Sequence, residues 1–164
     1  IGGVVSAHRS NMRSSGASVS HSWNRPPIDR MTNLNMEPGD TSLEEMISQT
    51  ENGILLDTCR SWSIDHRRDK FQFSAEFGQL IKNGELSEVV KNPNYMGRTL
   101  DFWNGLESVG DMSTYNIGGV TSCGKGEPQQ TMEVGHCMPA CKFQKVSVFG
   151  SKFSYSPGTK KRQY

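Results

Sequence analysis

Potential metal ligands gather in one stretch of the chain, residues 122–143. It holds three of the four cysteines and one of the four histidines: Cys123, His136, Cys137 and Cys141. Thiolate and imidazole are the ligands that zinc prefers, and four of them close a tetrahedral structural site. The spacing C-x12-H-C-x3-C, however, lacks the C-x2-C pair that usually places two ligands on one tight turn. A self-contained zinc site is therefore one hypothesis, and an incomplete site is the other.

The same residue types also have structural explanations. Cys137 and Cys141 flank Pro139 just before an alternating segment, where small thiols pack as hydrophobic side chains. Cys59 ends an apolar run and is expected in the core. The remaining histidines lie in polar surroundings and are expected to be exposed: His8, His21 and His66.

The composition predicts the fold class that must position these residues. A chain of 164 residues is long enough for one domain with a sizeable core. Only 34% of the residues are hydrophobic, and 17 glycines and 7 prolines indicate many turns and short elements. We therefore expect a β-rich α+β fold, mainly an antiparallel sheet with hairpins and one or two short helices.

Period-two alternation predicts strands over residues 70–80 and 142–149, and a short apolar run predicts a buried strand over 53–59. The pair Asn83-Gly84 between two apolar runs predicts a hairpin with a type I′ turn. Within the first of these strands, the apolar residues are predicted to share one core face: Phe71, Phe73, Ala75 and Phe77.

Thr41 or Ser42 can cap a helix in which Glu44 or Glu45 completes a capping box, and apolar residues follow at helical spacing. These signals predict a helix over residues 42–52. Residues 97–108 are predicted as a second helix, weakened by Gly105. Residues 109–125 are punctuated by glycine and are predicted as a loop or an edge strand.

The charge balance excludes several classes of partner. With 18 basic and 17 acidic residues the net charge is +1, so nothing predicts nucleic-acid binding. No apolar run approaches the roughly 18 residues of a membrane span, and no signal peptide is visible. Few, unevenly spaced cysteines favour reduced thiols and a cytoplasmic location.

The polarity of the chain suggests three parts. Residues 1–27 are polar and serine-rich, and are expected to be flexible or ordered by a partner segment. Residues 28–150 are expected to form the domain, and residues 151–164 a disordered tail. Because Ile1 stands where an initiator methionine would, we expect a fragment or a processed product.

Several short motifs follow one another along the chain. The first are Arg30-Met31-Thr32-Asn33, Pro38-Gly39-Asp40 and Gly53-Ile54. The later ones are Arg60-Ser61-Trp62-Ser63-Ile64-Asp65, Phe71-Gln72-Phe73, Ile81-Lys82-Asn83-Gly84, Phe102-Trp103-Asn104 and Cys123-Gly124-Lys125-Gly126-Glu127-Pro128. In this order the motifs resemble the C-terminal half of the TldD/PmbA family of zinc metallopeptidases, also called modulators of DNA gyrase, and the later ones resemble one subgroup of it. The resemblance covers about residues 25–150.

The resemblance implies a zinc ion held by two histidines of an H-E-x-x-x-H helix from the N-terminal half and by one cysteine from the C-terminal half. The matching cysteine is Cys123. Three protein ligands leave a position for water, and the glutamate between the histidines acts as the general base. This chain contains no H-E-x-x-x-H motif. It therefore resembles the C-terminal domain alone, expected to be inactive without the N-terminal half.

The resemblance also suggests lesser roles for other residues. His136 is expected to support the ligand or the local structure, whereas Cys137 and Cys141 depart from the family pattern and inherit no role. Gly124 and Gly126 would allow close approach of a metal or peptide. Arg30 and Asn33 are expected either to bind substrate or to position loops.

The expected partners are the N-terminal half, a second copy or a related subunit, and a peptide substrate. No residue supports a direct link to gyrase, because no basic stripe or DNA-reading helix is evident. The alternative function is a non-catalytic scaffold or dimerisation domain of a paired TldD/PmbA-like subunit. An upstream H-E-x-x-x-H motif would favour the enzyme over the scaffold.

Overall fold

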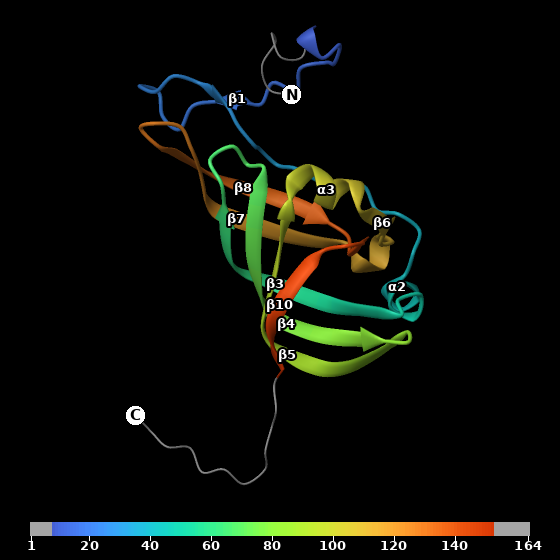
Figure 1. Cartoon of the computed structure of the whole chain (residues 1–164). Helices are drawn as coiled ribbons and strands as arrows, with labels where there is room; N and C mark the ends of the chain where they lie inside the picture. The colour runs from blue at the N-terminus through green and yellow to red at the C-terminus, as the bar shows by residue number, and fades with distance from the viewer. Residues whose placement is uncertain (1–7, 153–164) are drawn as a thin grey trace, which may run out of the picture. The chain divides into compact units, whose positions relative to one another are not determined.

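The computed structural model describes residues 8–152, which form two compact units (Figure 1). The first, here called the ribbon unit, consists of residues 8–38 and 112–139. The second, the sheet unit, consists of residues 39–111 and 140–152. Each unit is therefore built from two separate stretches of the chain.

A four-stranded antiparallel sheet forms the centre of the sheet unit. Its strands are β3 (Asn52–Ile64), β4 (Lys70–Lys82), β5 (Glu85–Arg98) and β10 (Ser147–Lys152), in the order β10-β5-β4-β3. Strands are confirmed over 53–59 and 70–80, and both are longer than predicted because the β3–β4 pairing extends over eleven registered residue pairs. The expectation that the first strand is buried is wrong, since every residue of β3 is half-buried or exposed.

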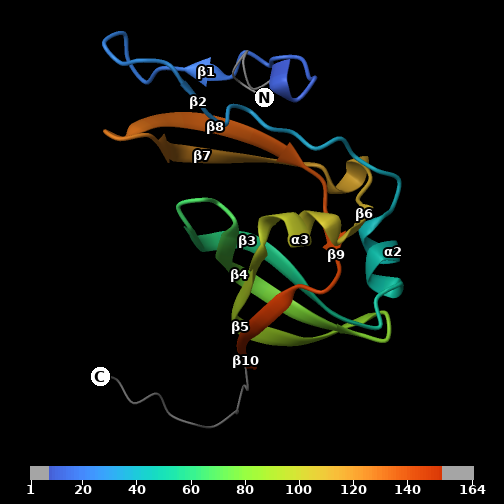
Figure 2. The same ribbon diagram turned by 45° about the horizontal axis from the view of Figure 1, so that its top comes forward.

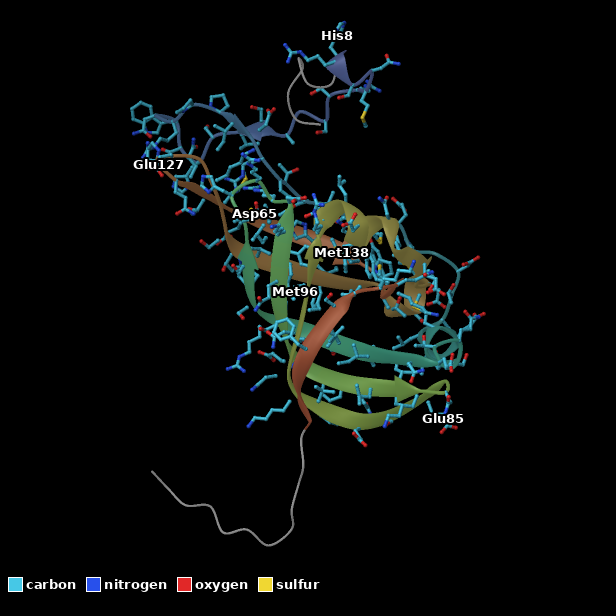
Figure 3. All side chains as sticks on the ribbon, in the orientation of Figure 1. His8, Asp65, Glu85, Met96, Glu127 and Met138 are labelled. Atoms are coloured by element: carbon cyan, nitrogen blue, oxygen red, sulfur yellow. The ribbon has the colours of Figure 1, made fainter. Side chains whose placement is uncertain are left out.

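The β4–β5 connection is the two-residue turn that the sequence predicts. Lys82 pairs with Glu85, and Asn83 and Gly84 have φ values of 50° and 81°. Positive φ at both central residues defines a type I′ turn, whose twist matches that of the flanking strands. In Figure 3 the labelled Glu85 marks this end of the sheet, and Asp65 marks the opposite end.

Aromatic rings make up much of the packing on one face of this sheet. Phe73 stacks on Tyr95 of the neighbouring strand, with ring centroids 5.5 Å apart. Phe102 of helix α3 (Thr99–Asn104) stacks on Phe143 at 3.9 Å. Such pairs stabilise a fold beyond the area that they bury.

The two helices of the sheet unit are shorter than predicted. Helix α2 (Leu43–Ser48) begins at the predicted cap, because the Ser42 hydroxyl accepts a hydrogen bond from the Glu45 N–H at 3.1 Å. The prediction of one helix over 97–108 is wrong in extent. Helix α3 ends at Gly105, and the next residues form strand β6 (Leu106–Val109), which pairs with β9 (Cys141–Phe143).

Three further expectations about strands and core residues are wrong. The strand predicted over 142–149 is interrupted between β9 and β10, where Lys145 adopts a φ of 56°. Phe77 is 41% exposed although it was predicted to share the core face, and the buried positions next to it along β4 are Ala75 and Gly78, which are not two residues apart. Cys59 is exposed and not in the core, since it lies at a register shift of β3.

The ribbon unit contains two antiparallel pairs and a short 3-10 turn (Met112–Thr114) (Figure 2). Strand β1 (Ser18–Val19) pairs with β2 (Ile28–Asp29), and β7 (Asn116–Lys125) pairs with β8 (Gln130–Met138). The edge strand predicted within 109–125 is thus present. Strand β8 was not predicted.

The observed architecture confirms a β-rich α+β fold with antiparallel strands and short helices. Neither of the six-residue helices α2 and α3, nor any other helix within residues 8–152, is long and apolar enough to cross a membrane. The proposed boundaries at residues 27 and 150 remain predictions; β10 continues to Lys152, and the rest of the predicted tail lies outside the described residues.

Candidate functional site

Cys123 lies on strand β7, two residues before its end, in the ribbon unit. It faces Met132 of strand β8 across the pair, next to a register shift between Val120 and Cys123. The thiol is free and the residue is half-buried. Because the thiol is only half-buried, a metal ion or another group outside the hairpin can still contact it.

Arg30 fixes the backbone around this cysteine. Its guanidinium donates to the carbonyl of Cys123 through Nη2, and to the carbonyl of Gln130 on strand β8 through Nη1 at 3.3 Å. Its own N–H donates to Ala17 at 3.0 Å. The side chain is buried, with only 6% of the residue exposed, and its Nε has no hydrogen-bond partner. Arg30 was expected either to bind substrate or to position loops. Its observed contacts are with backbone carbonyls, as for a residue that positions loops.

Gln130 is a second buried polar residue beside Cys123, with 4% exposed. Its Oε1 accepts from the backbone N–H of His21 at 2.9 Å, and its Nε2 donates to the carbonyl of Pro26 at 3.1 Å. This side chain therefore connects the loop between β1 and β2 to the β7–β8 hairpin. Sequence reasoning missed it, because nothing distinguishes it from the exposed Gln129 beside it.

The two glycines near Cys123 are explained by local structure. A Cβ on Gly124 would lie 1.9 Å from the side-chain nitrogen of Gln129, so any larger residue would displace that side chain. Gly126 has a φ of 92° in the turn, a conformation that residues with a Cβ rarely adopt. Neither glycine needs a bound metal or peptide to account for it.

Residues 33–36 lie along the outer edge of strand β8. The side-chain oxygens of Asn33 and Asn35 accept from the N–H groups of Gly135 and Cys137, at 2.9 and 3.0 Å. Met36 N–H donates to the carbonyl of Cys137 at 2.9 Å. Asn33 thus acts as a loop-positioning residue that satisfies an edge strand, which is one of its two predicted roles.

His136 lies on the same hairpin as Cys123 but near the opposite end. It faces Gly118, four residues further along β8 than the partner of Cys123, a separation of about 14 Å at the usual strand rise. Figure 3 shows the length of this hairpin, with Glu127 at its tip and Met138 at its other end. The Nδ1 atom of His136 is 3.1 Å from both backbone polar atoms of Leu34, and its buried Nε2 has no partner. The structure therefore does not bring the two predicted site residues together.

Of the other two cysteines of the cluster, Cys137 lies on the same hairpin as Cys123 but pairs with Ile117, near the opposite end. Cys137 hydrogen-bonds the hydroxyl of Tyr115, whose pKa is raised mainly by desolvation and further by this thiol. Cys141 belongs to the sheet unit, where burial raises the pKa of its thiol. Within residues 8–152 no three His, Cys, Asp or Glu side chains are grouped to hold a metal ion. A self-contained zinc site among these residues is therefore not supported.

Residues 3–150 match the family model of the PmbA/TldA metallopeptidase C-terminal domain. The chain belongs to this family. The resemblance drawn from its motifs is thereby confirmed, over a span that includes both units and the Cys123 hairpin.

Relatives of the PmbA/TldA family are named as metalloproteases. A metalloprotease of Methanocaldococcus jannaschii is 36% identical over 113 residues, which cover 68% of this chain and 24% of that protein. A metalloprotease TldD homologue of Buchnera aphidicola (subsp. Schizaphis graminum) is 29% identical over 147 residues, 90% of this chain and 30% of that protein. A zinc metalloprotease TldD homologue of Saccharolobus solfataricus is 27% identical over 135 residues, 82% and 29% respectively. The chain thus spans 24–30% of the length of these relatives.

Solved structures share the fold. TldE from Thermococcus kodakarensis superposes with a TM-score of 0.60 at 18% identity, over 88% of this chain and 29% of that one. A Thermotoga maritima protein named as a proposed modulator of a DNA gyrase gives a TM-score of 0.59 at 17% identity, over 90% and 29%. At these identities the likeness concerns the fold alone.

Proposed function

We propose that this domain contributes the Cys123 thiolate and part of the peptide-binding wall to a zinc metallopeptidase site that is completed by residues outside this chain. Alone, the domain is inactive. The observation that carries the proposal is the combination of a free, half-buried thiol with a backbone held by a buried arginine.

The donor set fits one ligand of such a site. A thiolate is a soft ligand well suited to zinc, whereas no group of three donors occurs within residues 8–152. One thiolate cannot hold zinc firmly, since high affinity comes from several ligands together. The remaining ligands, two histidines of an H-E-x-x-x-H helix, are proposed to come from the N-terminal half.

When bound, zinc supplies a Lewis acid that makes water a nucleophile at neutral pH. The contribution of this chain is positional. Arg30 holds the carbonyl of Cys123, and the hairpin closes below it where Gln130 pairs with Lys125. Together these contacts keep the thiol at a fixed place on strand β7. Cys123 is the one residue described here to which we assign the ligand role.

The outer edge of strand β7 is proposed to form the peptide-binding wall. Within residues 8–152, β7 pairs only with β8, so its other edge offers free backbone groups to an extended peptide. Gly118 and Gly119 lie on this strand with no atom within 4 Å of the place that a Cβ would occupy. An extended, flexible peptide could therefore approach this backbone closely.

The test compares Cys123→Ser with Cys137→Ser in the whole protein that carries this domain. Cys137 is matched because it is also half-buried and lies on the same hairpin. We expect Cys123→Ser to lose zinc and the hydrolysis of an unstructured peptide, and Cys137→Ser to keep both. Zinc is measured by metal analysis after dialysis. Full zinc content and activity in Cys123→Ser would contradict the proposal.

The second candidate is a non-catalytic scaffold or dimerisation domain, in a homodimer or with a related subunit. It is favoured by the absence of a three-ligand group within residues 8–152. Under this function the whole protein binds no zinc through Cys123, and both cysteine variants retain normal assembly. The same metal analysis, together with the mass of the complex in solution, therefore distinguishes the two candidates.

A further inference from the structure

Arg30 is an unusual residue for this fold, because its charge is buried without an acidic partner. Within residues 8–152 the structure records no ion pair for it, and its hydrogen bonds go to backbone carbonyls. Burying a guanidinium costs several kcal/mol unless the charge is well compensated. The two carbonyl acceptors compensate the buried charge only in part, because the Nε atom has no hydrogen-bond partner. Stability alone does not explain this side chain.

The two carbonyls that Arg30 contacts lie on opposite strands of one hairpin. Cys123 belongs to β7 and Gln130 to β8, and the strands turn back on each other between them. A planar guanidinium can hold both carbonyls at once in a fixed geometry, which an ammonium on a flexible stem cannot. Arg30 is itself tied to Ala17, so the hairpin is clamped to the β1–β2 pair.

We propose that Arg30 is the positioning residue of Cys123: its guanidinium fixes the backbone from which the thiol projects, and thereby the place of the metal ligand. That the thiol binds zinc rests on the function proposed above. That Arg30 holds the backbone of Cys123 in place does not depend on that function. Metal sites require ligands held within about 0.5 Å of the productive geometry. A backbone that opens locally next to a turn does not hold a ligand so precisely. The hydrogen bonds of Arg30 to both strands of the hairpin restrict such opening.

The test uses Arg30→Lys in the whole protein, with Arg25→Lys as the matched control. Arg25 is an exposed arginine on the loop between β1 and β2. The first readout is the rate of alkylation of Cys123 in the zinc-free protein, measured by mass spectrometry of its peptide. We expect a rise of about fivefold or more in Arg30→Lys, because local opening of the hairpin exposes the thiol, and no change in Arg25→Lys.

The second readout is zinc itself. We expect the zinc affinity of Arg30→Lys to fall about tenfold to a hundredfold, as for other residues that orient metal ligands. The thiolate-to-metal charge-transfer band of the cobalt-substituted protein should also shift, and a merely structural role would not move this band. Arg25→Lys should match the wild type in zinc affinity and in the position of the cobalt band.

The outcomes separate the two proposals. Equal alkylation rates in Arg30→Lys and Arg25→Lys would overturn the positioning role. Full zinc binding by Cys123→Ser would overturn the ligand role, whatever the alkylation rates are. If Arg30→Lys does not fold, NMR of the wild-type protein decides: slowly exchanging guanidinium Nη protons of Arg30 support the clamp, and free exchange refutes it.

Discussion

The side-chain oxygen of Asn33 accepts a hydrogen bond from the backbone N–H of Gly135 at 2.9 Å, although 102 residues separate them in the sequence. Asn35 makes the equivalent contact with Cys137. Two asparagine side chains thus take the place that a neighbouring strand would occupy at the edge of β8. This arrangement covers an edge that would otherwise offer free N–H groups.

Replacing Asn33 by alanine should open this edge locally. We expect a loss of about 0.5–1.5 kcal/mol in the free energy of unfolding, the usual net value of one hydrogen bond. Hydrogen exchange should accelerate at the Gly135 amide and stay unchanged at the Cys137 amide, which Asn35 still holds. Unchanged exchange at Gly135 would show that the Asn33 contact is not made in solution.

Replacing Gln130 by alanine should cost more than replacing its neighbour. Gln130→Ala removes a buried side chain and leaves the N–H of His21 and the carbonyl of Pro26, both part-buried, without their partner. We expect a loss of about 1–3 kcal/mol in the free energy of unfolding, measured by urea denaturation. Gln129→Ala, an exposed control, should change it by less than about 0.5 kcal/mol. Equal effects of the two variants would refute the bridging role of Gln130.

Gly84→Ala should destabilise the sheet unit. Gly84 has a φ of 81°, and a Cβ there would lie 2.6 Å from the carbonyl oxygen of Ser48. Both effects are unfavourable, and we expect a loss of at least about 1–2 kcal/mol in the free energy of unfolding. The control is Gly118→Ala, where φ is not positive and the position is open. A urea midpoint for Gly84→Ala equal to that of Gly118→Ala would contradict the turn geometry.

Acid should weaken the β3–β4 loop through Asp65. The backbone N–H of Lys70, at 2.6 Å, and that of Arg67, at 3.1 Å, donate to this carboxylate and lower its pKa below the ordinary value of 3.8 for an aspartate. A lowered pKa in the folded state means stability that is present above pH 3.8 and lost as the pH falls through the folded pKa. Asp65→Asn should be less stable than the wild type at pH 7, and the difference should shrink at low pH.

A constant difference between the two proteins from pH 7 to pH 2 would show that the Asp65 carboxylate does not make these bonds in the folded state.

Local signals predicted local structure well. The turn at Asn83-Gly84 and the cap at Ser42 both follow from the chemistry of residues adjacent in the sequence, and both are observed. The expectation from alternation was wrong at Phe77, and the expectation from an apolar run was wrong at Cys59, which lies at a register shift between β3 and β4. Such shifts are set by the pairing of distant strands, which a period-two pattern does not contain.

The sequence led to Cys123 through its resemblance to the family, and its role as a ligand stays a prediction. The residues that contact the backbone around it were only partly foreseen: Arg30 was named, and Gln130 was not. Gln130 could not be foreseen, because its importance comes from burial against a loop about a hundred residues away in sequence. The separation of His136 from Cys123 likewise depends on the register of β7 on β8, and compactness in sequence did not imply closeness in space.

The discontinuous ribbon unit has a consequence for the order of events during synthesis. Residues 8–38 leave the ribosome before their partners in residues 112–139, which follow only after residues 39–111 of the sheet unit. Contacts such as Arg30 with Cys123 join residues 93 positions apart, and pairings of this kind form slowly because a long loop must close first. The nascent N-terminal stretch must therefore stay unpaired, and accessible to chaperones, until the last third of the domain has emerged.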